Sequence, residues 1–171
     1  MVTYATPTRT QELAVYNNMK NRCASRNDYS NCVIGKTWEK DHDKLYTWFR
    51  NNYYILPDGE PVEVDKDILV PYNRIYSEDT CLLVPQSVNR FFSGIHGKNN
   101  TLPVGVTFDK KKQKYKASVS HKALGTFNTP DEAHQAYRKA KLKQLELLIE
   151  EYKDVVPSEV TEAMSQWLNI I

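Results

Sequence analysis

Ten basic side chains fall within forty residues of this chain, between Val104 and Lys143, and only three acidic side chains accompany them. The local net charge is therefore +7, whereas the whole chain of 171 residues carries a formal charge of only +2. Lysine and arginine form ion pairs with phosphate groups, so a concentrated basic face is typical of nucleic-acid binding. The alternative is a lysine surface that is simply solvated.

The sequence around these lysines predicts a small antiparallel sheet. Residues 104–109 and 114–120 alternate apolar and polar side chains, and residues 121–127 complete a third strand. Because successive side chains of a strand point to opposite faces, one face collects the apolar set and the other the polar set. The predicted apolar face holds Val106, Phe108, Tyr115, Ala117, Val119 and Phe127. The predicted nucleic-acid-binding residues are Thr107, Lys110, Lys111, Lys112, Lys114, Lys116, Ser118, Ser120 and Lys122.

A helix is predicted directly after the third strand. Thr129 fits the N-cap position, Pro130 fits the first helical position, and two acidic residues follow in the first turn. Small side chains recur at helical spacing and would allow close packing on the sheet. These are Ala133, Ala136 and Ala140, with Tyr137 beside them.

The segments GVTF (105–108), KYKASVS (114–120) and LGTFNTPDEAHQAY (124–137) resemble the plant ethylene-response-factor DNA-binding domain of the APETALA class. The resemblance covers about 40 residues and implies a sheet that enters the major groove of double-stranded DNA. Members of that family read bases with Arg and Trp from the strands. This chain has Thr107, Ser118, Ser120 and Ala123 at positions that carry Arg, Glu or Trp in the plant domains. We therefore expect phosphate contacts with weak sequence selectivity.

A second group of candidate residues lies in the first half of the chain. Residues 62–70 predict a strand, residues 80–85 a second strand and residues 86–95 a short helix. Asp65 and Lys66 lie on the first strand, and Asn89 lies on the helix. Taken alone, the acidic pair Asp65 and Asp67 has two readings. It could hold a metal ion, or it could form ion pairs with an arginine such as Arg74 or Arg90.

That order resembles the HNH nuclease fold, a ββα hairpin that holds one divalent metal ion, and more narrowly the phage-encoded HNH endonucleases that carry an APETALA-type domain. The resemblance covers most of residues 10–150. It rests on Arg22-Cys23, Trp38, Trp48, Asp65-Lys66-Asp67, Tyr76-Ser77, Thr80-Cys81, Val84-Pro85 and Asn89. It implies that Asp65 and Asn89 bind Mg²⁺ or Mn²⁺.

The same resemblance raises the question of which residue would be the catalytic base. Lys66 stands where family members have a His, and Thr80 replaces an Asn. Lysine has an ordinary pKa of about 10.4 and is a poor base at neutral pH unless burial lowers that value. Lys66 is the first candidate base and His96, in the loop after the helix, is the second.

Composition limits the remaining possibilities. No apolar run reaches the roughly 18 residues that a membrane span needs, and the first twenty residues lack the apolar core of a signal peptide. The odd number of cysteines, Cys23, Cys32 and Cys81, argues against a disulfide framework. We therefore expect a cytoplasmic protein, in the host cell if phage-encoded. A structural zinc site on these cysteines and His42 is the weaker alternative to buried free thiols, since no C-x-x-C pair is present.

The predicted fold class is α+β, with a ββα-metal (HNH-like) module and a helical lead, followed by a three-stranded antiparallel sheet packed on one helix. The lead consists of helices at residues 10–21 and 38–51. The expected segments are 1–98 (HNH-like), 99–103 (linker), 104–153 (DNA-binding) and 154–171, an acidic, helical brace or dimer contact.

Three functions are consistent with this sequence. The first is a metal-dependent DNA endonuclease of phage or mobile-element type. The second is a catalytically inactive DNA-binding protein on the same folds. The third is a phage regulator that binds a host or defence protein.

Overall fold

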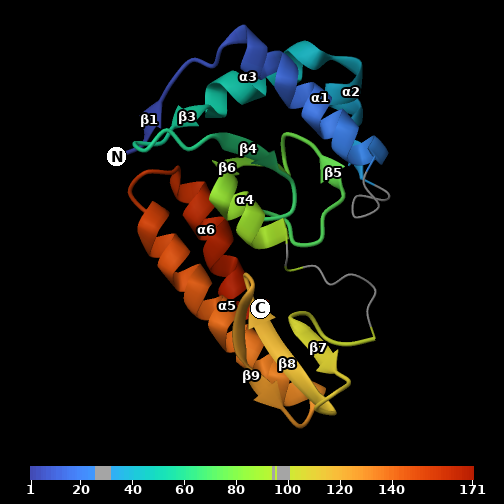
Figure 1. Cartoon of the computed structure of the whole chain (residues 1–171). Coiled ribbons are helices and arrows are strands. Elements are labelled where there is room, and N and C mark those ends of the chain that lie inside the picture. Colours follow the sequence, from blue (N-terminus) through green and yellow to red (C-terminus); the bar gives the residue numbers. More distant parts are fainter. Residues whose placement is uncertain (26–31, 94, 96–100) are drawn as a thin grey trace.

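Residues of alternating polarity form the three-stranded antiparallel sheet that the sequence predicts (Figure 1). The structure is a computed structural model that describes residues 1–25, 32–93, 95 and 101–171. The strands are β7 (Val106–Asp109), β8 (Lys114–Val119) and β9 (Lys122–Phe127). Ser120 and His121 connect β8 to β9 and both have positive φ angles, 47° and 64°, as a tight two-residue hairpin requires.

The long helix α5 (Pro130–Tyr152) follows the sheet and begins as predicted. The Thr129 side chain accepts a hydrogen bond from the Glu132 backbone N–H, and the Glu132 side chain accepts one from the Thr129 N–H. This capping box satisfies backbone donors that a helix N-terminus otherwise leaves unpaired. With 23 residues the helix is about 34 Å long, at about 1.5 Å per residue. It therefore extends well beyond the sheet.

The two halves of α5 belong to two different hydrophobic cores. Ala133 packs with Val106 and Ala117 in a small core beneath the sheet. Tyr137 of α5 packs closely against the backbone of Gly105, where a Cβ atom would lie 2.0 Å from the Tyr137 ring. Leu145 and Tyr152, in the second half of the helix, belong to the main core with α6 (Ser158–Gln166) and Trp167. In Figure 1, α5 and α6 run side by side from the sheet toward the rest of the molecule.

The remaining elements build the main core with short strands and helices. The strands pair as β1 with β3, β2 with β5 and β4 with β6, and the second of these pairs is parallel. The strands are β1 (Thr3–Tyr4), β2 (Val33–Ile34), β3 (Tyr54–Ile55), β4 (Val62–Asp65), β5 (Ile75–Tyr76) and β6 (Leu82–Pro85). The helices are α1 (Arg9–Ser25), α2 (Lys36–Lys40), α3 (His42–Asn52) and α4 (Gln86–Ser93). Among the helices in the described part of the chain, none has both the length and the apolar character needed to cross a bilayer.

One predicted helix is divided in the structure. Residues 38–51 were expected to form a single helix, but α2 ends at Lys40 and α3 begins at His42. Asp41 between them has extended backbone angles, and its side chain accepts a hydrogen bond from the Asp43 N–H at 3.2 Å. Aspartate favours such an N-cap position over a helix interior, so Asp41 starts a new helix.

The predicted brace at the C-terminus packs into the main core. Trp167 is only 1% exposed and packs its ring against Phe92, with 5.2 Å between the ring centroids. Its indole N–H donates to the backbone carbonyl of Ile68 at 2.9 Å. The C-terminal segment therefore holds the loop after β4 and helix α4 from one side.

Lys141 is a buried connection between α5 and α4. Its ammonium donates to the carbonyl oxygen of Phe91 at 2.8 Å and lies 3.6 Å from the centroid of the Phe91 ring. Phe91 lies in the last turn of α4, where carbonyl groups lack helical partners and attract a cation. The side chain is 5% exposed, and burial lowers the pKa of Lys141 to about 8.

We expect a pH-dependent difference in stability between the wild type and Lys141→Met. The unfolded chain keeps the ordinary lysine pKa, so between about pH 8 and pH 10 the unfolded state binds more protons than the folded state. Rising pH should therefore stabilise the wild type relative to Lys141→Met, by on the order of 1 kcal/mol after solvent screening. Urea unfolding of the wild type and of Lys141→Met at about pH 8 and about pH 10 measures the difference in their free energies of unfolding. Both proteins have the same tyrosines and cysteines, so titration of those groups does not contribute to the difference. Equal differences at both pH values would contradict the assignment.

Candidate functional site

The face of the β7–β9 sheet that points away from α5 is exposed and polar. Cross-strand pairing places Thr107 beside Lys116 and Asp109 beside Lys114. Thr107, Lys114 and Lys116 are exposed and Ser118 is half-buried, while Ala117 and Val119 point to the helix and are buried. The predicted division of β8 into two faces is therefore confirmed.

Asp109 is a residue of this face whose role was not identified from the sequence. Its carboxylate pairs with the Lys116 ammonium at 2.7 Å and accepts the backbone N–H groups of Lys111 and Lys112 at 3.0 and 3.2 Å. The hydrogen bond from Lys116, helped by those two N–H groups, lowers the pKa of Asp109. An exposed ion pair contributes about 0–1 kcal/mol, so Lys116 can exchange Asp109 for a phosphate group at small cost. Asp109 also fixes the turn that presents the lysines at 110–112.

Two of the predicted binding residues lie outside this face. Register pairs Lys122 with Val119, whose side chain is buried beneath the sheet, so Lys122 does not share a face with Lys116. A β-bulge between Ala117 and Ser118 shifts the register of β9, and this shift places Lys122 on the opposite face from the one predicted. Ser120 is exposed in the hairpin turn. The structure therefore brings together Thr107, Lys110, Lys111, Lys112, Lys114, Lys116 and Ser118 along β7, β8 and their connecting turn.

Asp65 ends strand β4 instead of continuing it. One carboxylate oxygen of Asp65 accepts the backbone N–H groups of Asp67 and Ile68, at 2.9 and 2.7 Å. These bonds turn the chain, which is why the strand predicted to reach residue 70 stops at residue 65. Asp65 is 7% exposed, and burial, together with the neighbouring charge of Asp67, raises the pKa of its carboxyl group.

Lys66 is buried beside Asp67. Only 4% of Lys66 is exposed, and its ammonium lies 2.9 Å from an Asp67 carboxylate oxygen and 5.9 Å from the centroid of the Tyr76 ring. Burial by itself lowers the pKa of Lys66, but the hydrogen bond and the charge of Asp67 outweigh it, and the pKa is raised. A protonated ammonium has no lone pair with which to accept a proton. Lys66 in this arrangement does not fit the role of a general base at neutral pH.

The side chain of Asn89 forms a hydrogen bond with Glu63. The Asn89 side-chain N–H donates to Glu63, which also accepts hydrogen bonds from Gln86 at 2.9 Å and Arg22 at 3.3 Å. Burial alone would raise the pKa of Glu63, but these donors and the arginine charge together lower it. No hydrogen bond joins Asp65 to Asn89 among the residues that the structure describes.

Glu63 and Gln86 were not identified from the sequence, although a signal was present. Glu63 is two residues before Asp65 and therefore lies on the same face of β4. Gln86 and Asn89 are three residues apart and share a face of α4.

The described side chains do not fit a divalent metal ion as they are arranged. Mg²⁺ and Mn²⁺ need several converging oxygen ligands. Here one Asp65 oxygen is engaged by two backbone N–H groups, Asn89 is bonded to Glu63, and the ammonium of Lys66 supplies the positive charge beside Asp67. Within the described ranges, no group of three or more His, Cys, Asp or Glu side chains is placed to hold a metal ion.

The other predicted candidates are His96 and the three cysteines. His96, the second candidate base, lies outside the described residues. Cys32 and Cys81 are buried, Cys23 is half-buried, and all three are free thiols. Burial raises the pKa of Cys81 to about 12, so its thiol stays protonated at neutral pH.

Comparison with protein-family models, with curated proteins and with solved structures found no match for this chain.

Proposed function

We propose that this protein binds double-stranded DNA through the outer face of the β7–β9 sheet and the lysine-rich turn between β7 and β8. The observation that carries the proposal is the exposure of Lys110, Lys111, Lys112, Lys114 and Lys116 on one continuous surface. Helix α5 packs on the opposite face of the sheet and leaves this surface uncovered. Breaking the exposed ion pair between Lys116 and Asp109 costs only about 0–1 kcal/mol, so it does not prevent Lys116 from binding phosphate.

The dimensions of the sheet suit the major groove of DNA. Neighbouring strands lie about 4.8 Å apart, so three strands measure roughly 10 Å across, and the major groove is about 12 Å wide. A sheet in the major groove is also what the resemblance to the APETALA-class domains implies. Lysine and hydroxyl side chains on β7 and β8 suit phosphate oxygens, and the face has no Arg to pair with guanine. Binding should therefore depend little on sequence.

A salt series with several unrelated duplexes tests the proposal. Fluorescence anisotropy should give similar affinities for all sequences at about 50 mM salt and a steep loss of affinity by about 200 mM, because bound counterions are released from the phosphates. No binding at the lower salt concentration would sink the proposal. A strong preference for one duplex would contradict the expected phosphate readout.

Metal-dependent DNA cleavage is the second candidate function. The order β4, β6, α4, with Asp65 at the end of the first strand and Asn89 on the helix, favours it because it matches the ββα order of the HNH nucleases. Two observations argue against cleavage. Lys66 is charged and cannot accept a proton, and Asn89 is hydrogen-bonded to Glu63.

We expect that supercoiled plasmid is bound but is not nicked faster when Mg²⁺ or Mn²⁺ is added. The reason is that, among the residues that the structure describes, neither a base nor a set of converging oxygen ligands is assembled around Asp65. Agarose gels of plasmid incubated with wild type, Asp65→Ala and Asn89→Ala measure this directly. Nicking that requires the metal and disappears in both variants would establish the nuclease and refute the expectation.

A further inference from the structure

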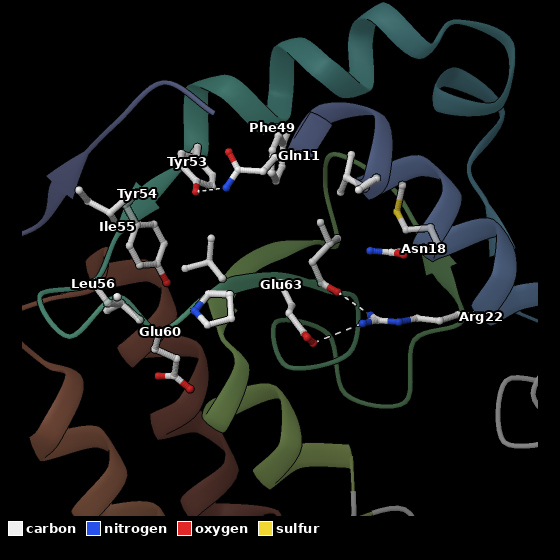
Figure 2. Close-up of a pocket in the computed structure, with 17 residues that line it drawn as sticks. Gln11, Asn18, Arg22, Phe49, Tyr53, Tyr54, Ile55, Leu56, Glu60 and Glu63 are labelled. Atoms are coloured by element: carbon white, nitrogen blue, oxygen red, sulfur yellow. Dashed lines mark hydrogen bonds and ion pairs between the residues drawn. The ribbon is translucent and has the colours of Figure 1, made fainter. Parts of the chain in front are cut away.

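A groove of about 330 Å³ lies between helix α1 and strand β4 (Figure 2). Its volume falls within the range of roughly 300–1,000 Å³ that is usual for ligand sites. The walls are mostly apolar and include Val15, Met19 and Leu56. The groove ends at two polar contacts. At one end Gln11 donates to the Tyr53 hydroxyl at 2.7 Å, and at the other Arg22 pairs with Glu63 at 3.3 Å.

The floor of this groove is the outer edge of a strand. Strand β4 belongs to a two-stranded sheet and pairs only with β6, so its other edge has no strand partner in the part of the chain that the structure describes. The carbonyl of Val64 points to that edge, because it accepts a hydrogen bond from Arg22 of α1 at 3.2 Å. The N–H and C=O of one strand residue point to the same side, and alternate residues repeat the direction. The N–H groups of Val62 and Val64 and the Val62 carbonyl therefore face the groove.

The pairing with β6 agrees with this direction. Val62 lies opposite Pro85, which has no backbone N–H to offer. Gln86, the next residue, donates its backbone N–H to the carbonyl of Pro61 at 3.0 Å instead. The outward groups of Val62 are thus not needed to hold the β4–β6 pair together.

From this arrangement we propose that the groove is a docking site for an extended peptide segment of a partner protein, which adds a strand to the outer edge of β4. An extended backbone presents a donor and acceptors at the spacing of the groups left on this edge, the N–H groups of Val62 and Val64 and the carbonyl of Val62. Side chains of a strand alternate, so every second side chain of the peptide would enter the apolar part of the groove. Unpaired strand edges are the surfaces that proteins use for such pairing.

The proposed segment has a defined chemistry. It pairs with the outward groups of Val62 and Val64, carries apolar side chains at alternate positions, and lies along α1 beside Ala14 and Asn18. The charge of Glu63 is balanced by Arg22, so strong selection for charged side chains is not expected. The site lies on α1 and β4 and is therefore separate from the sheet proposed to bind DNA.

Selection from a displayed library of random decapeptides on the full chain tests the proposal. Enriched sequences should show apolar residues at alternate positions. Their affinity should fall by about five- to tenfold for Val62→Pro, which removes one outward N–H, and should change much less for Val62→Ala, which keeps it. Asn18→Phe, which narrows the groove from the helix side, should weaken binding without touching the strand.

A backbone control on the peptide completes the test. N-methylation of alternate amides should abolish binding while keeping every side chain, and amide exchange at Val62 and Val64 should slow when the unmodified peptide is added. The proposal is overturned if no sequence is enriched, if enriched peptides bind Val62→Pro and Asn18→Phe as well as the wild type, or if N-methylation has no effect. Protection of those two amides by a DNA duplex and not by peptide would also overturn it.

Discussion

Trp167→Ala is expected to lower the free energy of unfolding by about 3–5 kcal/mol, the usual cost of truncating a buried tryptophan. The indole is 1% exposed, packs against Phe92 and donates its N–H to the Ile68 carbonyl. Alanine would leave a cavity and a buried carbonyl without its donor, and both effects destabilise the fold. A loss of this size would show that the C-terminal segment is part of the folding unit.

Urea unfolding monitored by circular dichroism measures this loss, with Ile170→Ala as the matched control. Ile170 lies three residues away and is 39% exposed. Its truncation should therefore change the free energy of unfolding by only about 0.5 kcal/mol. Equal effects of the two substitutions would contradict the packing described for Trp167.

Replacement of Lys112, Lys114 and Lys116 by glutamine should have the largest effect on DNA affinity. Each lysine that neutralises a phosphate contributes about 0.9 to the slope of the logarithm of affinity against the logarithm of salt concentration, so the triple variant should lose about 2–3 from that slope. Affinity at low salt should fall at least about tenfold. Lys116 should account for the smallest share, because it must first leave Asp109.

The control for this variant removes the same charge elsewhere. Lys36, Lys40 and Lys44 are exposed on α2 and α3, at the opposite end of the molecule from the sheet (Figure 1). Their replacement by glutamine should leave the salt slope nearly unchanged. If both triple variants lose the same affinity, binding follows net charge and not the β7–β9 face.

Local patterns in the sequence were enough to predict the sheet and the start of α5. The alternation in residues 114–119 is decided within the strand itself, and the Thr129 cap depends on residues within one helical turn. The α+β class follows from these elements. Lys122 was placed on the wrong face because a bulge changes the register without leaving a signal in the alternation.

The arrangement around Asp65 could not be predicted, because it depends on contacts between distant residues. Asn89 pairs with Glu63 across 26 positions, and Arg22 reaches Glu63 across 41. Whether Lys66 is protonated depends on the balance between its burial and the charge of Asp67, and a sequence gives neither quantity. Lys141 shows the same limit: it belongs to the basic run, yet the fold buries it against Phe91.

Amide chemical-shift mapping of the full chain with a short DNA duplex at low salt tests the central claim most directly. We predict that the largest shifts fall on Thr107, on the turn at 110–112 and on Lys114, Lys116 and Ser118, and that they disappear when salt is raised. Shifts concentrated around Asp65, Lys66 and Asn89, or no shifts at any duplex concentration, would contradict it.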